Sequence, residues 1–137
     1  MRILALDPGT KRIGIALSDE LKTIAQPLEF FPAEPFDELV ARLKALVHQH
    51  HVELILVGLP RNMDGTYGPA ATRVREFVTE LKKLIPLRIK TWDERLTSAQ
   101  ANRVLIEANV SRAERKEKVD KMAAAILLQS YLDSLPV

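Results

Sequence analysis

The sequence predicts a single α/β domain in which a five-stranded mixed sheet carries helices on both faces. Two observations lead to this prediction. Paired apolar segments open the chain like an antiparallel hairpin, and short apolar runs then alternate with segments of helical periodicity. A length of 137 residues suits one domain, and no linker or internal repeat divides residues 1–137.

The first three strands are predicted from short apolar segments. Residues 2–6 form a mostly apolar run, and Pro8 with Gly9 suits a turn, because proline presets φ and glycine accepts unusual backbone angles. Residues 13–17 alternate large and small apolar side chains, which favours a second strand that pairs back on the first. Residues 24–31 give a weaker third strand.

Helical periodicity and proline positions predict the middle of the chain. A first helix is expected from Pro35 to about Val47, because apolar residues recur there at helical spacing. Residues 53–57 are nearly all apolar, as expected of a strand covered on both faces. Pro69 then opens a second helix, and residues 87–92 form the fifth strand.

Two capping boxes predict further helices near the C-terminus. Thr97 with Gln100, and Ser111 with Glu114, each match the pattern in which a hydroxyl caps one helix amide and the acid or amide side chain caps another. The last helix is expected to end near Leu132.

Composition excludes several classes of function. With no cysteine, the chain has no disulfide, no thiolate zinc site and no cysteine nucleophile. The N-terminal apolar run stops at Asp7, too early for a signal peptide, and no stretch reaches the ~20 apolar residues of a membrane helix. We therefore expect a cytoplasmic protein that does not contact membranes.

The net charge of +2 is modest, but basic residues gather in one segment. Five lie close together in the predicted last helix: Arg112, Arg115, Lys116, Lys118 and Lys121. Such a run fits either a nucleic-acid contact or a solvated helix face.

Asp7 is the first candidate metal ligand. It ends the first predicted strand beside a glycine turn, and functional groups in open α/β sheets gather at the carboxyl ends of strands. A simple turn-forming role explains the same residue equally well.

Three further acidic residues are candidate metal ligands. Asp93 and Glu94 end the fifth strand, and because adjacent strand residues point to opposite faces, one of the two is expected to face Asp7. Asp120 lies in the last helix ahead of small apolar residues, where helix and sheet would pack closely, so its carboxylate needs a metal or a salt bridge to Lys116 or Lys121.

Three carboxylates from separate elements favour a hard divalent cation. Mg²⁺ or Mn²⁺ fits these oxygen ligands better than zinc. A second histidine-rich group, His48, His50 and His51, could bind a metal, but a solvated helix end with favourable dipole contacts explains it more simply.

Four sequence blocks resemble the YqgF/RuvX family, and they span nearly the whole chain. They are DPGTKRIGIALSD from Asp7 to Asp19, VGLPRNMDGT from Val57 to Thr66, DERLTS from Asp93 to Ser98, and KVDKMAA from Lys118 to Ala124. The resemblance implies a ribonuclease-H-like fold related to the RuvC Holliday-junction resolvases. It also implies a nuclease that matures the 5′ end of the 16S ribosomal RNA precursor, with junction resolution as the alternative.

The resemblance also implies which residues act. Asp7, Glu94 and Asp120 would be the catalytic metal ligands, with Asp93 as the alternate to Glu94. Phosphate contacts are expected from residues on or beside the blocks: Lys11, Arg12, Asn62, Arg73, Arg95 and Lys118. One departure concerns the central strand, where RuvC-like relatives carry an acid and this chain has Leu59 and Pro60.

The expected chemistry is phosphodiester hydrolysis at a site with two divalent ions that share Asp7. The partner would be structured RNA, as in a ribosome precursor, or branched DNA, with little base readout because aromatic residues make up only 5%. Two other functions fit parts of the sequence. One is a non-catalytic ribosomal-RNA assembly factor, and the other is an ATP-dependent phosphotransferase, whose phosphate loop also contains Asp-x-Gly-Thr.

Overall fold

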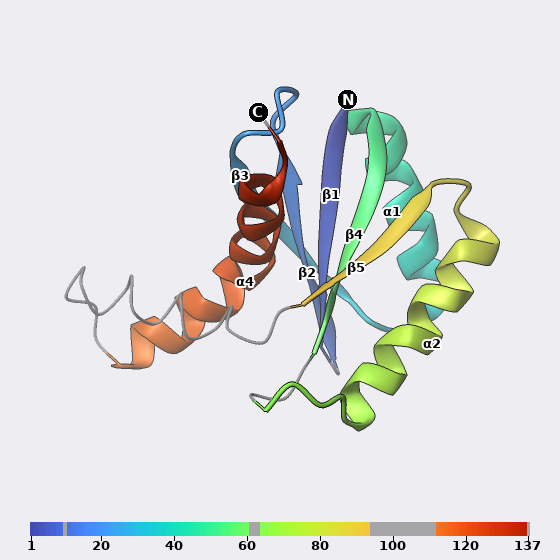
Figure 1. Cartoon of the computed structure of the whole chain (residues 1–137). Helices are drawn as coiled ribbons and strands as arrows, with labels where there is room; N and C mark the ends of the chain where they lie inside the picture. Colours follow the sequence, from blue (N-terminus) through green and yellow to red (C-terminus); the bar gives the residue numbers. More distant parts are fainter. Residues whose placement is uncertain (10, 61–63, 94–111, 137) are drawn as a thin grey trace.

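A computed structural model describes residues 1–9, 11–60, 64–93 and 112–136, with residues 112–121 described by their backbone alone. Its centre is a five-stranded sheet in the order β3-β2-β1-β4-β5 (Figure 1). The strands are β1 (Arg2–Pro8), β2 (Arg12–Ser18), β3 (Ala25–Pro32), β4 (Val52–Leu59) and β5 (Arg88–Asp93). The first three pair antiparallel, whereas β4 and β5 run parallel to β1, so the predicted mixed sheet is confirmed.

Helices cover both faces of this sheet. The described helices are α1 (Phe36–His50), α2 (Pro69–Leu84) and α4 (Arg112–Ser134). Figure 1 shows α1 and α2 on one face and α4 on the other. As predicted, Pro35 directly precedes α1 and Pro69 is the first residue of α2, where its missing N–H costs no hydrogen bond. The expected capping boxes at Thr97 and Ser111 lie outside the described residues.

Strand β1 is buried on both faces. Ile3, Leu4, Ala5 and Leu6 are at most 2% exposed. Because side chains alternate along a strand, Leu4 and Leu6 pack toward α1 and α2, while Ile3 and Ala5 pack toward α4. This double cover explains why the segment is a continuous apolar run rather than an alternating one.

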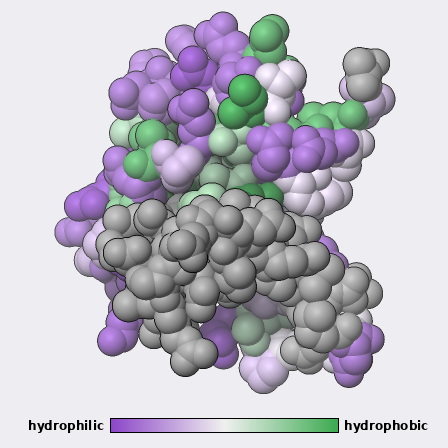
Figure 2. Space-filling view, turned by 90° about the vertical axis from the view of Figure 1, so that its left-hand side faces the viewer, coloured by the Kyte–Doolittle hydropathy of each residue, from purple (hydrophilic) through white to green (hydrophobic). Residues whose placement is uncertain are grey.

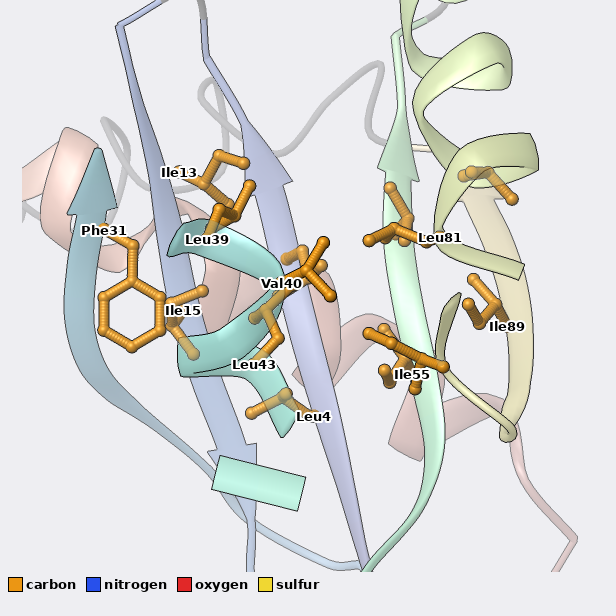
Figure 3. Close-up of a cluster of buried hydrophobic side chains, with 14 of the residues drawn as sticks. Leu4, Ile13, Ile15, Phe31, Leu39, Val40, Leu43, Ile55, Leu81 and Ile89 are labelled. Atoms are coloured by element: carbon orange, nitrogen blue, oxygen red, sulfur yellow. The ribbon is translucent and has the colours of Figure 1, made fainter. Parts of the chain in front are cut away.

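The two faces have separate hydrophobic cores. The larger core lies beneath α1 and α2, and Figure 3 labels part of it: Leu4, Ile13, Ile15, Phe31, Leu39, Val40, Leu43, Ile55, Leu81 and Ile89. The smaller core lies beneath α4 and is built mainly from Ile3, Ala5, Ala16, Leu54, Leu56, Ala124, Leu127, Leu128, Tyr131 and Leu132. Each buried aliphatic side chain stabilises the fold by about 1.5–3 kcal/mol.

The outer surface is mixed. Among the coloured residues on the face shown in Figure 2, hydrophilic ones predominate and hydrophobic ones form small patches, as is usual for a folded domain. Among the described helices, none combines the length and the apolar composition needed to span a bilayer.

The hairpin between β1 and β2 depends on a close backbone approach. β1 continues through Pro8, the residue at which the predicted turn starts, and the Gly9 N–H donates to the Arg12 carbonyl oxygen at 3.0 Å. A Cβ on Gly9 would lie 2.6 Å from that same oxygen. A Cβ on Gly14 would instead meet its nearest neighbours at 3.5–3.7 Å, an ordinary contact.

We therefore predict opposite results from the same substitution at these two glycines. Gly9→Ala should destabilise the protein by about 1–3 kcal/mol, because the new methyl group forces the turn backbone apart. Gly14→Ala should leave the free energy of unfolding close to that of the wild type. Urea denaturation of both variants measures this, and equal midpoints would contradict the described turn geometry.

Asp19 organises the connection between β2 and β3. Its Oδ1 accepts hydrogen bonds from the backbone N–H groups of Thr23, at 2.7 Å, and Ile24, at 3.0 Å, and its Oδ2 accepts one from the Thr23 hydroxyl at 2.9 Å. These bonds favour the charged carboxylate, so they lower the pKa of Asp19, with the Ile24 N–H contributing most.

This lowered pKa gives a pH-dependent stability. Since the pKa is lower in the folded state, the stabilisation is present above the ordinary value of 3.8 and is lost as the pH falls through the folded-state pKa. Asp19→Asn, which keeps an acceptor but removes the charge, should unfold at lower urea than the wild type at pH 7. The difference should shrink in acid, and a difference that grew toward pH 3 would refute the assignment.

Candidate active site at the carboxyl edge of the sheet

The carboxyl ends of three parallel strands define one edge of the sheet. β1, β4 and β5 run in the same direction, and they end at Pro8, Leu59 and Asp93. Asp7 is therefore carried to the edge at which ligands bind in open α/β sheets. Its side chain is half-buried, and no salt bridge or side-chain hydrogen bond within the described residues involves it.

Asp7 has no side chain beside it on β2. Its direct partner there is Gly14, and Gly14 in turn pairs with Phe30 of β3. A Cβ built on Gly14 lies 3.7 Å from the Cβ of Asp7 and 3.5 Å from the Phe30 ring, so all three residues share one face of the sheet.

The arrangement on the other side of Asp7 is similar. Leu6 pairs with Val57 of β4, so the next residue pair along these parallel strands is Asp7 beside Gly58. Gly58 is paired with Trp92 of β5. Asp7 is thus flanked by two glycines, and aromatic residues of the two edge strands lie beyond them.

Helix α4 covers the same face. The Ala124 Cβ lies 3.7 Å from a Cβ built on Gly14, which places this part of the helix directly over the glycine beside Asp7. Asp120 is in α4, one helical turn before Ala124. Its backbone is therefore near the Asp7 edge, and its side chain lies outside the described atoms, as does that of Lys118.

Asp93 lies on the opposite pleat from Asp7. Trp92 packs against the core beneath α4, the face that Asp7 shares, and consecutive strand residues point to opposite faces. Asp93 is exposed and ends β5. Glu94 and Arg95 lie outside the described residues.

Contacts with α4 fix the orientation of the Trp92 indole. The Tyr131 ring meets it edge to face with centroids 5.0 Å apart, and its Nε1–H donates to the Ser130 hydroxyl at 3.4 Å. The Lys90 ammonium lies 5.1 Å from the Tyr131 centroid. An aromatic side chain held from two sides offers a preorganised surface.

Three of the predicted phosphate contacts are described, and all are exposed. Lys11 and Arg12 lie in and directly after the β1–β2 turn, and Arg73 is in the first turns of α2. The Arg12 guanidinium stacks over the Phe30 ring at 4.2 Å. Asn62 lies outside the described residues.

The histidine group is at the end of α1, as expected. His51 is the left-handed C-cap residue of the helix, and His50 Nδ1 lies 3.4 Å from an Arg2 guanidinium nitrogen. Within the described residues, no three His, Asp or Glu side chains come together in a way that could bind a metal ion. Glu94 and the side chain of Asp120 lie outside the described atoms.

Sequence reasoning missed the row of glycines and aromatics around Asp7. The available signals were Gly14 inside the predicted second strand and Gly58 directly after the predicted fourth strand, because glycine in a strand often marks a close approach of a ligand or of another backbone. Phe30 and Trp92 were overlooked because the low aromatic content does not indicate where the few aromatic residues lie.

A family model described as "RuvX: Holliday junction resolvase" matches residues 1–134. The chain belongs to the RuvX family. Curated relatives match it over almost their whole length and carry the name "Putative pre-16S rRNA nuclease". The protein of Desulforamulus reducens is 49% identical over 134 residues, with 98% of each chain covered. That of Halothermothrix orenii is 47% identical over 133 residues, with 97% of this chain and 95% of the relative covered.

Solved structures support the same fold. RuvC of T. thermophilus, in complex with a Holliday junction substrate, superposes with a TM-score of 0.55 at 14% identity, covering 96% of each chain. The fowlpox virus Holliday junction resolvase gives a TM-score of 0.56 at 15% identity, covering 99% of this chain and 100% of the viral one. The fold is thus that of the ribonuclease-H-like resolvases, as the resemblance implied.

Proposed function

We propose that this protein is a divalent-metal-dependent nuclease that hydrolyses phosphodiester bonds at the 5′ end of the 16S ribosomal RNA precursor in the cytoplasm. The observation that carries the proposal is the end-to-end match, at 47–49% identity, to relatives named as pre-16S rRNA nucleases. The position of Asp7 at the carboxyl edge supports it, because this is where a nuclease of this fold needs a carboxylate.

The surroundings of Asp7 suit a hydrated cation. Gly14 and Gly58 carry no side chain that could block the carboxylate from the neighbouring strands, although Ala124 and the Phe30 ring lie over Gly14. Carboxylate oxygens are the ligands that Mg²⁺ and Mn²⁺ prefer. Asp7, Glu94 and Asp120 would hold the metal, with Glu94 preferred over Asp93 because Asp93 is on the opposite pleat.

A bound divalent cation, or a pair of them, would lower the pKa of a water nucleophile and stabilise the leaving oxygen. The role of the protein is to position the phosphate. Lys11, Arg12 and Arg73 lie exposed around the Asp7 edge, where their charges can neutralise a nucleic-acid backbone. Asn62, Arg95 and Lys118 are proposed to extend this set.

Junction resolution is the second candidate, supported by the family description and by the shared fold with two Holliday-junction resolvases. The two candidates use the same carboxylates and differ in the nucleic acid that is cut. A third outcome, RNA binding without cleavage, would indicate an assembly factor.

Replacing Asp7 tests the catalytic site. Asp7→Asn should reduce cleavage by more than about a hundredfold, since even a residue that only supports a metal ligand typically contributes about 10–100-fold. Asp19→Asn is the matched control, because it makes the same chemical change in the β2–β3 connection, away from the carboxyl edge. The assay uses Mg²⁺ or Mn²⁺ with a 16S precursor end, single-stranded RNA, duplex DNA and a four-way junction.

Preferred cutting of the precursor end supports the proposal, whereas preferred cutting of the four-way junction would favour the resolvase. Equal cleavage by Asp7→Asn and the wild type would overturn the assigned site. RNA binding that survives in Asp7→Asn, without cleavage by any variant, would favour the assembly factor.

The choice between the adjacent acids at the end of β5 has its own test. Glu94→Gln should weaken metal binding and remove cleavage, whereas Asp93→Asn should leave both within about a factor of a few, since Asp93 lies on the opposite pleat. Trp92 is the only tryptophan, so its fluorescence during Mn²⁺ titration reports metal binding independently of activity. The reverse pattern would assign the ligand to Asp93.

A further inference from the structure

An apolar cavity of about 380 Å³ opens at the same edge of the sheet, beneath α2. Strand β1 contributes Pro8 to its wall, β2 contributes Ile13, and α2 contributes Arg73, Val74 and Phe77. This volume is at the small end of the range of about 300–1,000 Å³ for ligand sites, so the cavity suits one compact group rather than an extended apolar peptide.

The cavity and Asp7 lie on opposite faces of one edge. Asp7 and Pro8 are consecutive in β1, so their side chains point to opposite sides, Asp7 toward α4 and Pro8 toward the cavity. Only the β1–β2 turn at Gly9 separates them. A polynucleotide that crosses the edge at this turn can place one phosphate at Asp7 and a neighbouring nucleotide at the cavity.

The chemistry of the wall favours an aromatic ring with a phosphate beside it. Among the described residues of the lining, Arg73 is the only charged one, and none is an acid that would repel a nucleic acid. The Phe77 ring is held edge to face by Phe36, with centroids 6.0 Å apart at 79°, which makes it a fixed wall.

The start of α2 adds a second feature that suits an anion. Helix N-termini attract phosphate groups, and α2 begins without a side-chain cap and without an acidic residue in its first turn. Ala70, in that first turn, is part of the cavity wall. A nucleotide whose base enters the cavity would have its phosphate close to this helix end and to Arg73.

We propose that this cavity binds one unstacked nucleobase of a single-stranded RNA substrate, with Phe77 against the base and Arg73 at its phosphate. RNA is commonly recognised through bases that are splayed out and packed on aromatic or arginine side chains. The inference rests on the proposed RNA nuclease function and gives it a means of choosing the cleavage position.

The test measures RNA binding in chelator, so that cleavage cannot occur. The probes are single-stranded RNAs that span the 5′ end of the 16S precursor, each lacking the base at one position. For the wild type, loss of one particular base near the cut should weaken binding by about fivefold to a hundredfold, the usual contribution of a stacked base.

Filling the cavity should remove this dependence. Ala70→Leu should weaken binding of the intact RNA by a similar factor. In this variant, removing the base should weaken binding no further, because the filled cavity has already lost its contact with that base. Thr72→Leu is the matched control, since it adds a similar side chain at an exposed position of the same helical turn outside the cavity. This control should behave as the wild type.

The outcomes separate this inference from the proposed function. If the wild type binds and cuts RNA but Ala70→Leu binds intact RNA equally well, the cavity is not a base site, and an apolar side chain of a protein partner becomes its candidate occupant. If every base is dispensable in the wild type, the inference also fails while the nuclease assignment stands. If the wild type neither binds nor cuts RNA, the proposed function itself is refuted.

Discussion

Burial of β1 on both faces is the constraint on which the rest of this structure depends. Ile3 to Leu6 are almost inaccessible to solvent. Their backbone N–H and C=O groups must therefore form hydrogen bonds with strands on both sides, and their apolar side chains must pack against helices on both faces. A charged residue is tolerable only where this cover ends. Asp7 is the first residue after the buried stretch of β1, which ties the position of the candidate site to the packing of the core.

The same edge has a polar and an apolar side. Because side chains alternate along β1, Asp7 faces the glycine-flanked floor beneath α4, and Pro8 faces the cavity beneath α2. One short turn thus separates a position suited to a cation and phosphate from one suited to a ring. A substrate that contacts both sides must be flexible and charged along its length, which describes a single strand of nucleic acid better than a small molecule.

Much of the fold could be predicted because the apolar patterns were strong. The strands at residues 2–6, 13–17, 24–31, 53–57 and 87–92 all exist within one or two residues of their predicted ends, and Pro35 and Pro69 mark the helix starts. The alignment of Asp7 with Gly58 and Trp92 could not be predicted, because alternation assigns faces within one strand, whereas register between strands is set by packing. The cavity was missed for a similar reason, since its wall joins residues from distant segments. The roles of Glu94, Asp120 and the basic residues stay predictions that rest on their places in the sequence and on the family resemblance.

The long separation in sequence between the β1–β2 hairpin and α4 affects how the protein folds during its synthesis. Residues 2–18 form the hairpin that carries Asp7, and they leave the ribosome long before the residues of α4 that pack over it. Contacts between segments so far apart in the chain form late, because the entropy lost in closing a long loop comes before the stabilisation by the contact. During synthesis, the smaller core beneath α4 is therefore still incomplete when the larger core beneath α1 and α2 can already form. If Asp120 of α4 completes the site as proposed, the nuclease is inert during its own translation, when it lies next to ribosomal RNA.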